Sequence, residues 1–275
     1  MKNFKLYILD NGRMWGDKAN FIAGCTTATA SNKNPDSQWI EFPIQTFLID
    51  HPDGLLLFDT ACHPKGMTER WPDFIRELSP YYVTEEELLV NRLAQLNVKP
   101  EDVKYVVISH LHDDHGGCLE LFKNSEVYIS DREFTRTMRQ YVLRKDLNVH
   151  VPKDIEQWIK AELNWRPIMD DEVELKLMDG VTILNFGSGH SWGVMGLFLE
   201  MEKAGNVIIA SDALYTAENA GPPVRVPGII YDSLGYISTA EKINKMAKER
   251  NAQIWFGHDM EQFKTLVKST EGHYE

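Results

Sequence analysis

The sequence is poor in cysteine, in long apolar runs and in basic residues, and each shortage excludes something. Only three cysteines, Cys25, Cys62 and Cys118, occur among 275 residues, and none of them forms a Cys-x-x-Cys pair. This odd, scattered set does not fit a disulfide framework. It favours small buried thiols in a reducing compartment, so we expect a cytoplasmic protein.

No apolar run approaches the roughly 18 residues that a membrane-spanning helix needs. The apolar stretch near the N-terminus is interrupted by Asp10 and is too short for the core of a signal peptide. We therefore expect neither a secretory leader nor a membrane partner.

Basic residues are outnumbered by acidic ones. Lys and Arg total 29 against 41 Asp and Glu, a formal net charge of −12. Such a chain repels polyanions, which argues against a nucleic-acid partner. Apolar residues at 43% and charged residues at 25% are ordinary values for a globular protein, so disorder and fibrous folds are excluded.

Short apolar runs with turn residues between them predict strands at 44–50, 55–58, 105–109, 127–130, 181–186, 195–201, 207–211 and 253–256. Apolar residues at helical spacing predict helices at 84–96, 132–143, 154–163 and 239–250, the first opened by a capping box at Thr84 and the second capped by Asp131. Some strands are adjacent and others alternate with helices, which predicts an α+β fold. We expect one domain over residues 1–275, with excursions from the strand framework at about 11–39 and 132–166.

A dense polar cluster follows the predicted strand at 105–109. It comprises His110, His112, Asp113, Asp114 and His115, and Gly116-Gly117 then allows the chain to turn. Imidazole nitrogens together with carboxylate oxygens suit Zn²⁺ and neighbouring transition metals better than Mg²⁺ or Ca²⁺. The alternative is a solvated loop with incidental histidines, but this order directly after a β-rich run favours a metal site.

Three further polar residues stand at the ends of predicted strands. They are His190, Asp212 and His258, and the common edge of a sheet would gather them. Taken singly, His190 or His258 would more often be an ordinary surface or core histidine, yet beside the first cluster we interpret the three residues as ligands. The other histidines, His51, His63, His150 and His273, lack this context.

The order His-x-His-x-Asp-His, then Gly-His, then an Asp after a strand, then a C-terminal Gly-His resembles the metallo-β-lactamase superfamily. The resemblance implies an αββα sandwich of two mixed sheets flanked by helices. It also implies two divalent ions per chain, Zn²⁺ first, with Co²⁺, Mn²⁺ or Fe²⁺ as alternatives. One ion would be held by His110, His112 and His190 and the other by Asp114, His115 and His258, with Asp212 bridging both. Asp59 matches the aspartate that orients a ligand histidine.

Within that superfamily the sequence resembles the N-acyl homoserine lactonases. Tyr215 lies three residues after Asp212, where those enzymes place a tyrosine, and the segments at 39–44 and 49–54 are also similar. The resemblance implies a quorum-quenching hydrolase that opens the lactone ring of N-acyl-L-homoserine lactones by attack of a metal-bridging hydroxide. Tyr215 would stabilise the oxyanion and Asp114 would pass a proton to the leaving oxygen. The expected partner is a small lactone, and a homodimer fits the resemblance.

Several alternatives stay open. Another lactonase, such as one acting on 4-pyridoxolactone, fits the motifs nearly as well. A thioesterase like glyoxalase II would need a basic cluster for its anionic substrate, and none is evident near the ligand segments. A nuclease like ribonuclease Z is opposed by the charge of −12. A binding module that has lost activity is disfavoured because every ligand position is filled.

The substrate's acyl chain requires an apolar pocket, and two groups of residues are candidates for it. The first is Met14, Trp15 and Phe21; the second is Phe134, Met138 and Tyr141, whose helical spacing equally predicts core packing. Asp113 stands where some lactonases carry a large apolar residue facing the substrate, so that contact is not expected here.

Overall fold

A computed structural model describes residues 4–275, which form two mixed β-sheets. The first sheet has the order β4-β1-β2-β3-β5-β6-β7 and the second β12-β11-β10-β9-β8. The strands are β1 (Lys5–Asp17), β2 (Trp39–His51), β3 (Gly54–Phe58), β4 (Tyr81–Tyr82), β5 (Val103–Val107), β6 (Glu126–Ser130), β7 (Asn164–Ile168), β8 (Glu174–Met178), β9 (Val181–Gly187), β10 (Val194–Met201), β11 (Gly205–Ser211) and β12 (Ala252–Phe256). Strands β3, β5, β6 and β7 run parallel, as do β11 and β12, and the other pairs are antiparallel.

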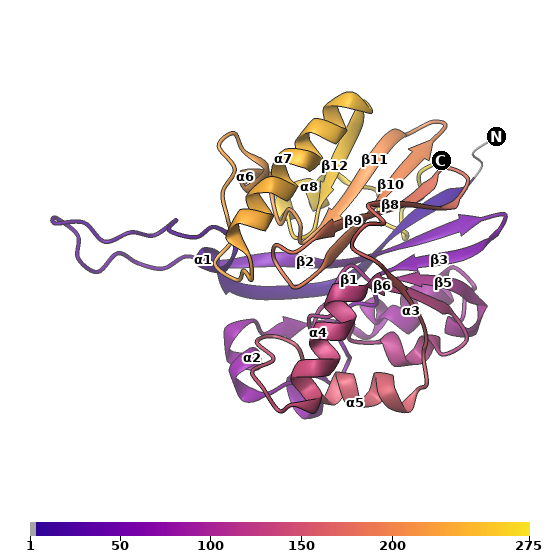
Figure 1. Ribbon diagram of the computed structural model, residues 1–275, viewed down its shortest axis with the longest axis horizontal. Coiled ribbons are helices and arrows are strands. Elements are labelled where there is room, and N and C mark those ends of the chain that lie inside the picture. Colours follow the sequence, from indigo (N-terminus) through magenta and orange to yellow (C-terminus); the bar gives the residue numbers. More distant parts are fainter. Residues whose placement is uncertain (1–3) are drawn as a thin grey trace.

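Helices cover the outer face of each sheet, which gives the expected four layers (Figure 1). The α-helices are α1 (Lys18–Phe21), α2 (Asp73–Leu78), α3 (Leu89–Gln95), α4 (Asp131–Val142), α5 (Pro152–Lys160), α6 (Ala217–Ala220), α7 (Ser233–Glu249) and α8 (Met260–Thr265). Short turns of other helix types are η1 (Gly66–Arg70), η2 (Glu85–Glu87), η3 (Pro100–Asp102) and η4 (Leu119–Phe122). Leucines of α3 and the Trp158 face of α5 pack on the first sheet, and Ala240 and Ile243 of α7 pack on the second. The predicted αββα sandwich is confirmed.

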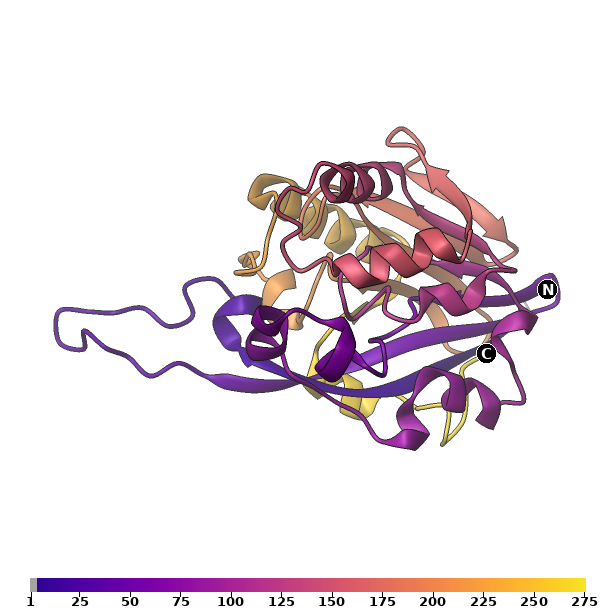
Figure 2. The same ribbon diagram turned by 90° about the horizontal axis from the view of Figure 1, so that it is seen from below.

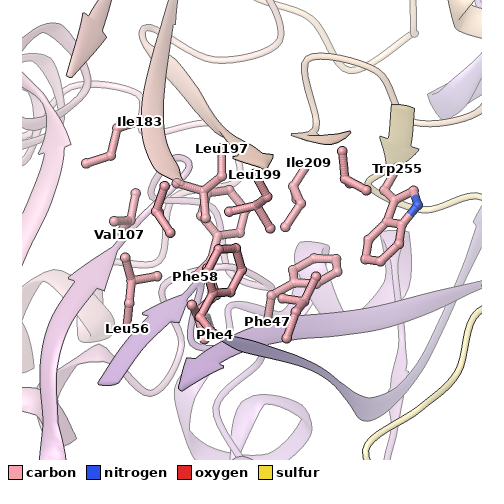
Figure 3. Close-up of a cluster of buried hydrophobic side chains, with 14 of the residues drawn as sticks. Phe4, Phe47, Leu56, Phe58, Val107, Ile183, Leu197, Leu199, Ile209 and Trp255 are labelled. Atoms are coloured by element: carbon pink, nitrogen blue, oxygen red, sulfur yellow. The ribbon is translucent and has the colours of Figure 1, made fainter. Parts of the chain in front are cut away.

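The two sheets face each other across an apolar core (Figure 3). Phe47 and Phe58 of the first sheet lie with ring centroids 6.2 Å apart, and Phe47 stacks on Trp255 of β12. Leu197 and Ile209 fill the space between from the second sheet and are fully buried. Because this core fixes the sheets against each other, the strand ends at one edge are held rigidly.

All eight predicted strands are confirmed as β2, β3, β5, β6, β9, β10, β11 and β12, with ends that differ by a few residues. Strands β1, β4, β7 and β8 were not predicted. The helix predicted at 84–96 divides at Leu88 into η2 and α3, with the capping box at Thr84 present. Ser130, and not Asp131, is the N-cap of α4, and α7 begins at Ser233, before the predicted start.

Both predicted excursions lie largely outside the strands, but their bounds differ from the structure. Residues 11–17 belong to β1. The pairing register with β2 shifts between Asp10 and Arg13, so Asn11-Gly12 forms a bulge that does not end the strand. The stretch 132–166 is the helical crossover, through α4 and α5, between the parallel strands β6 and β7, and its last residues already lie in β7.

Residues between α1 and β2 form an arm that projects from the body of the molecule (Figure 2). Over residues 23–38 only Cys25, Thr26 and Pro35 are half-buried, and the others are exposed. No helix within residues 4–275 is both long enough and apolar enough to cross a bilayer.

Candidate metal centre and substrate pocket

Five strands end at one edge of the sandwich, and each delivers a polar side chain there. Asp59 follows β3, the His110–His115 turn follows β5, His190 follows β9, Asp212 follows β11 and His258 follows β12. The Asp59 N–H donates to the Val107 carbonyl (2.9 Å), which joins the ends of β3 and β5. The side chains converge because the apolar strands that precede them share one core.

Three imidazoles meet at the first part of this centre. His112 Nδ1 lies 3.0 Å from His110 Nε2 and 2.8 Å from His190 Nε2. All three rings are at least 96% buried. Three ring nitrogens directed at one point form the donor set that Zn²⁺ and similar ions accept.

The second part joins Asp114, His115 and His258. Asp114 Oδ1 lies 3.4 Å from His115 Nε2, and Asp114 Oδ2 lies 3.3 Å from His258 Nε2. The ligand atoms of this trio lie within 4.8 Å of one another, as do those of the first trio. The described residues thus contain two adjoining groups that could each hold an ion.

Asp212 lies between the two groups. Its Oδ2 is 3.3 Å from His190 Nε2 and 3.7 Å from His110 Nε2. Its Oδ1 is 3.1 Å from His258 Nε2 and 3.4 Å from His115 Nε2. One carboxylate therefore offers an oxygen to each group, which is the arrangement a bridging ligand requires.

The centre leaves buried polar atoms unsatisfied by the protein alone. Within residues 4–275, neither His115 Nε2 nor Asp212 Oδ1 has a hydrogen-bond partner, although both are shielded from solvent. Burial lowers the pKa values of His110 and His112 well below the ordinary range, and the neighbouring imidazoles act in the same direction. Neutral imidazoles present lone pairs, so His110 and His112 fit a cation.

Contacts around the centre fix the ring orientations. Asp59 Oδ2 accepts from His115 Nδ1 (2.8 Å), and Asp59 also accepts from the Ser109 N–H and hydroxyl. His190 Nδ1 donates to the Ile229 carbonyl and His258 Nδ1 to the Pro43 carbonyl, both at 3.0 Å. A proton held on Nδ1 leaves Nε2 of the same ring free to ligate.

Charge balance within the centre also favours ligation. Burial alone would raise the pKa of Asp212, but the imidazoles of His258, His115 and His190 outweigh it and hold that pKa well below the ordinary value. Asp212 therefore stays ionised. An ionised carboxylate is the form that binds a metal.

Two glycines allow the loops to approach this closely. A Cβ on Gly117 would lie 2.3 Å from the His63 nitrogen and 2.6 Å from the Ala61 oxygen, where the two loops meet backbone to backbone. A Cβ on Gly257 would lie 2.7 Å from Asp212 Oδ1. Any side chain at either position would displace the centre.

Sequence reasoning missed two buried residues beside the centre. Glu133, in the first turn of α4, accepts hydrogen bonds from the Leu111 N–H, the Ser191 hydroxyl, the Gly193 N–H and His150. It thereby joins the loop of His110 and His112 to the loop of His190. No predicted strand precedes His150, yet its ring centroid lies 4.7 Å from that of His112. One signal in the sequence could have indicated Glu133: it follows closely on the end of β6, just as the predicted ligands follow the ends of other strands.

A pocket opens over the centre. Its walls are mainly apolar, and they are made by Met14, Phe21, Phe42, Ile75, Leu78, Val149 and Ile229. Polar atoms come from Asn20, Ser79, Asp113 and Tyr215 and from the ligand residues. No Lys or Arg occurs among the described residues that line the pocket.

Tyr215 and Asp113 both line this pocket, and burial raises the pKa of each side chain. The Tyr215 hydroxyl lies 3.0 Å from His190 Nδ1, and burial raises the pKa of the phenol well above its ordinary value. Asp113 is 6% exposed, and burial together with the charge of Asp114 raises its pKa well above the ordinary range. Because its pKa is raised, Tyr215 keeps its proton at neutral pH.

The two apolar groups considered for the acyl chain have different positions. Met14 and Phe21 line the pocket, whereas Trp15 lines a separate surface groove with Trp39 and Tyr82. Phe134, Met138 and Tyr141 pack beneath the first sheet and are not among the described residues that line the pocket. Their helical spacing indicates core packing.

The family model for the metallo-β-lactamase superfamily matches residues 39–133, so fold and site together define a protein of that class. Among curated proteins, N-acyl homoserine lactonase AiiB of Agrobacterium fabrum is 40% identical over 273 residues, covering 98% of this chain and 99% of AiiB. AiiA of Bacillus thuringiensis subsp. kurstaki is 27% identical over 95% of each chain. The chain belongs to the N-acyl homoserine lactonase family.

Solved structures of N-acyl homoserine lactone hydrolases are similar to this chain over nearly its whole length. An N-acyl homoserine lactone hydrolase with its product N-hexanoyl-L-homoserine bound at the catalytic metal centre superposes with a TM-score of 0.80 at 26% identity, covering 98% of this chain and 99% of that one. A B. thuringiensis AiiA mutant with N-decanoyl-L-homoserine bound at the active site gives the same TM-score and coverage.

Proposed function

We propose that this chain hydrolyses the lactone ring of N-acyl-L-homoserine lactones with two divalent ions, Zn²⁺ in the first instance. The observation that carries the proposal is Asp212, whose two oxygens face two separate groups of ligand atoms beneath an apolar pocket. Family membership at 40% identity over nearly the whole chain supports the substrate class.

The geometry supports a ligand role for each of seven residues. His110, His112 and His190 would hold one ion, Asp114, His115 and His258 the other, and Asp212 would bridge them. When bound, such ions supply Lewis acidity and a water of lowered pKa, from about 15.7 to about 7. Imidazole and carboxylate ligands also suit Co²⁺, Mn²⁺ and Fe²⁺, so metal analysis of the purified protein decides the identity.

The chain's own groups would handle the charge and the proton. Tyr215 would donate from its hydroxyl to the lactone carbonyl oxygen as negative charge develops there, since its raised pKa keeps the phenol protonated. The neighbouring imidazoles of His115 and His258 hold the pKa of Asp114 below its ordinary value, so its carboxylate would first accept the proton that the attacking water releases. It would then pass this proton to the ring oxygen as the acyl carbon–oxygen bond breaks. Water is consumed, and the products are an N-acyl homoserine carboxylate and a proton.

The pocket supports a lactone over the alternatives. Its walls suit an uncharged acyl chain, and the described lining residues contain no cationic side chain for an anionic thioester such as S-lactoylglutathione. The test is pH-monitored hydrolysis by the metal-loaded protein of N-hexanoyl- and N-decanoyl-homoserine lactone, 4-pyridoxolactone and S-lactoylglutathione. We expect acyl homoserine lactones to be the best substrates, and a preference for either of the other two would overturn the proposal.

Two further features belong to the proposal. The three cysteines are free, which supports a reducing compartment such as the cytoplasm.

A homodimer is supported by the exposed arm at 23–38 and by Trp39 and Tyr82 beside it, 54% and 61% exposed, because a second copy would give them contacts. Light scattering of the intact protein tests this: we expect a dimer that a deletion within the arm converts to a monomer, and a monomeric intact protein would contradict it.

A further inference from the structure

Two polar atoms in the pocket have no partner in the protein. Asn20 Nδ2 and Asp113 Oδ2 are both shielded from solvent, and neither makes a hydrogen bond to any residue from 4 to 275. Both residues line the pocket over the metal centre, among walls that are otherwise mainly apolar. One atom is a donor and the other an acceptor.

Unpaired buried atoms of this kind are costly. Leaving a buried donor or acceptor unsatisfied costs about 1–3 kcal/mol, so a folded protein keeps few of them without a use. A ligand that pairs both atoms regains that free energy on binding. The two atoms are therefore candidates for substrate recognition.

The backbone holds both residues in place. The Asn20 carbonyl in α1 accepts from the Gly228 and Ile229 N–H groups, and the Ile229 carbonyl in turn accepts from His190. Asp113 lies within the turn that carries His112 and Asp114. Donor and acceptor thus stand on two different elements of the pocket wall, each tied to the metal centre.

A secondary amide has the matching chemistry. It presents one N–H donor and one carbonyl acceptor, and because the peptide-like bond is trans and planar these point in opposite directions. A pair of protein groups that grips such an amide must therefore come from two sides, one an acceptor and one a donor. The lactone ring of an N-acyl homoserine lactone carries its acyl chain through an amide of this kind.

Building on the proposed function, we propose that Asn20 and Asp113 form a subsite for the substrate's amide. Asp113 Oδ2 accepts from the amide N–H, and Asn20 Nδ2 donates to the amide carbonyl. A carboxyl group retains an acceptor oxygen whether or not it is protonated, so the contact does not depend on its ionisation. The subsite makes the enzyme select lactones that bear a secondary amide over lactones that bear a plain alkyl chain.

Two substrates test the subsite in the metal-loaded enzyme. N-hexanoyl-homoserine lactone has the amide, and α-hexyl-γ-butyrolactone has the same ring with an alkyl chain at the same position. The measured quantity is the ratio of their kcat/KM values. Losing one hydrogen bond to a charged or amide group should lower this ratio about 10- to 100-fold in Asp113→Leu and in Asn20→Leu.

Matched variants separate recognition from damage. Asp113→Asn keeps an acceptor oxygen and should retain most of the wild-type ratio. Asn206→Leu removes an amide that donates to the Arg250 carbonyl near the start of β11, away from the pocket, and should leave the ratio unchanged. Because Asp113 adjoins Asp114, metal content is measured for every variant; if Asp113→Leu loses metal, Asn20→Leu alone decides.

Binding supplies a second readout. Calorimetry with N-hexanoyl-homoserine, the ring-opened product that keeps the amide, should show weaker binding to both leucine variants. An equal loss of kcat/KM on both lactones, or an unchanged ratio of the two kcat/KM values in Asn20→Leu, would overturn the amide subsite. The proposed function would still stand. A wild-type protein that opens α-hexyl-γ-butyrolactone but no acyl homoserine lactone would instead overturn the proposed function itself.

Discussion

Replacing Asp59 by asparagine tests how the protein prepares one metal ligand. The buried Asp59 carboxylate accepts three hydrogen bonds, from the Ser109 N–H (2.7 Å), the Ser109 hydroxyl (2.8 Å) and His115 Nδ1 (2.8 Å). An asparagine keeps one oxygen, and the Ser109 N–H, which can only donate, requires it. The NH₂ group then faces His115 Nδ1 and cannot accept from it. The ring would then favour the tautomer with its proton on Nε2, the atom that would otherwise ligate.

The expected loss falls on the second ion. Removing a partner that orients a ligand histidine typically costs about 10- to 100-fold in metal affinity, or roughly 1.4–2.8 kcal/mol at 1.4 kcal/mol per tenfold change. The group formed by His110, His112 and His190 contains no direct contact with Asp59 and should keep its affinity. Competition with a chromophoric chelator measures both Zn²⁺ affinities separately.

Asp53→Asn is the matched control. Asp53 also faces a histidine, with its Oδ2 3.5 Å from His51 Nδ1, but its side chain is 65% exposed. It lies at the opposite end of β3 from Asp59. This variant should bind both ions as the wild type does. Wild-type affinity for both ions in Asp59→Asn would refute the reasoning that Asp59 sets the His115 tautomer.

Three further outcomes are expected. Tyr215→Phe should lower kcat about 10- to 100-fold with two ions still bound and the pH profile unchanged in shape between 6 and 9, because the raised pKa of Tyr215 removes it from titration there; an unchanged kcat would exclude its role. Arg70→Met should lower the free energy of unfolding by about 3–5 kcal/mol in urea titrations, since the pairs to Asp154 (2.6 Å) and Glu120 (2.7 Å) are largely buried; a loss below 1 kcal/mol would contradict this. Burial and the nearby charges of Arg70 and Lys65 lower the pKa of His63 to about 4, so between pH 6.5 and 4 the folded chain binds fewer protons than the unfolded one and stability falls as pH falls. His63→Gln should reduce that fall by about 1 kcal/mol after allowance for solvent screening, and an identical pH dependence in the two proteins would refute the assignment.

The sandwich and the location of the centre were predictable because the central strands are strongly apolar and end abruptly in polar residues. His110 follows β5 after Ile108 and Ser109, and Asp212 directly follows β11, so the sequence itself marks the edge where they meet. The structure brings every candidate ligand to that edge. Their roles in metal binding stay predictions.

The strands that escaped prediction lie mostly at or near sheet edges. β8 has only five residues that alternate between half-buried leucines and exposed polar side chains, and β7 contains Pro167, which disfavours a central strand. β1 is longer, but the bulge at Asn11-Gly12 interrupts its alternation. The local sequence pattern predicts a strand poorly where pairing with neighbouring strands supplies most of that strand's stability.

Glu133 and His150 could not be assigned from sequence for a different reason. Their hydrogen bond joins α4 to the segment before α5, and Glu133 also holds the loop of His190. Such a contact depends on how the crossover packs over the strand ends, and no spacing within the chain records it. The unpaired atoms of Asn20 and Asp113 likewise become apparent only in the folded chain, where both residues line one pocket.

Metal back-titration tests the central claim most directly. The protein is stripped with a chelator, Zn²⁺ is returned in steps, and acid release from N-hexanoyl-homoserine lactone is followed at constant pH. The structure predicts no hydrolysis by the stripped chain and activity that rises until two equivalents per chain are bound. Full activity in the stripped protein, or a plateau at one equivalent with no further gain, would contradict a two-metal lactonase.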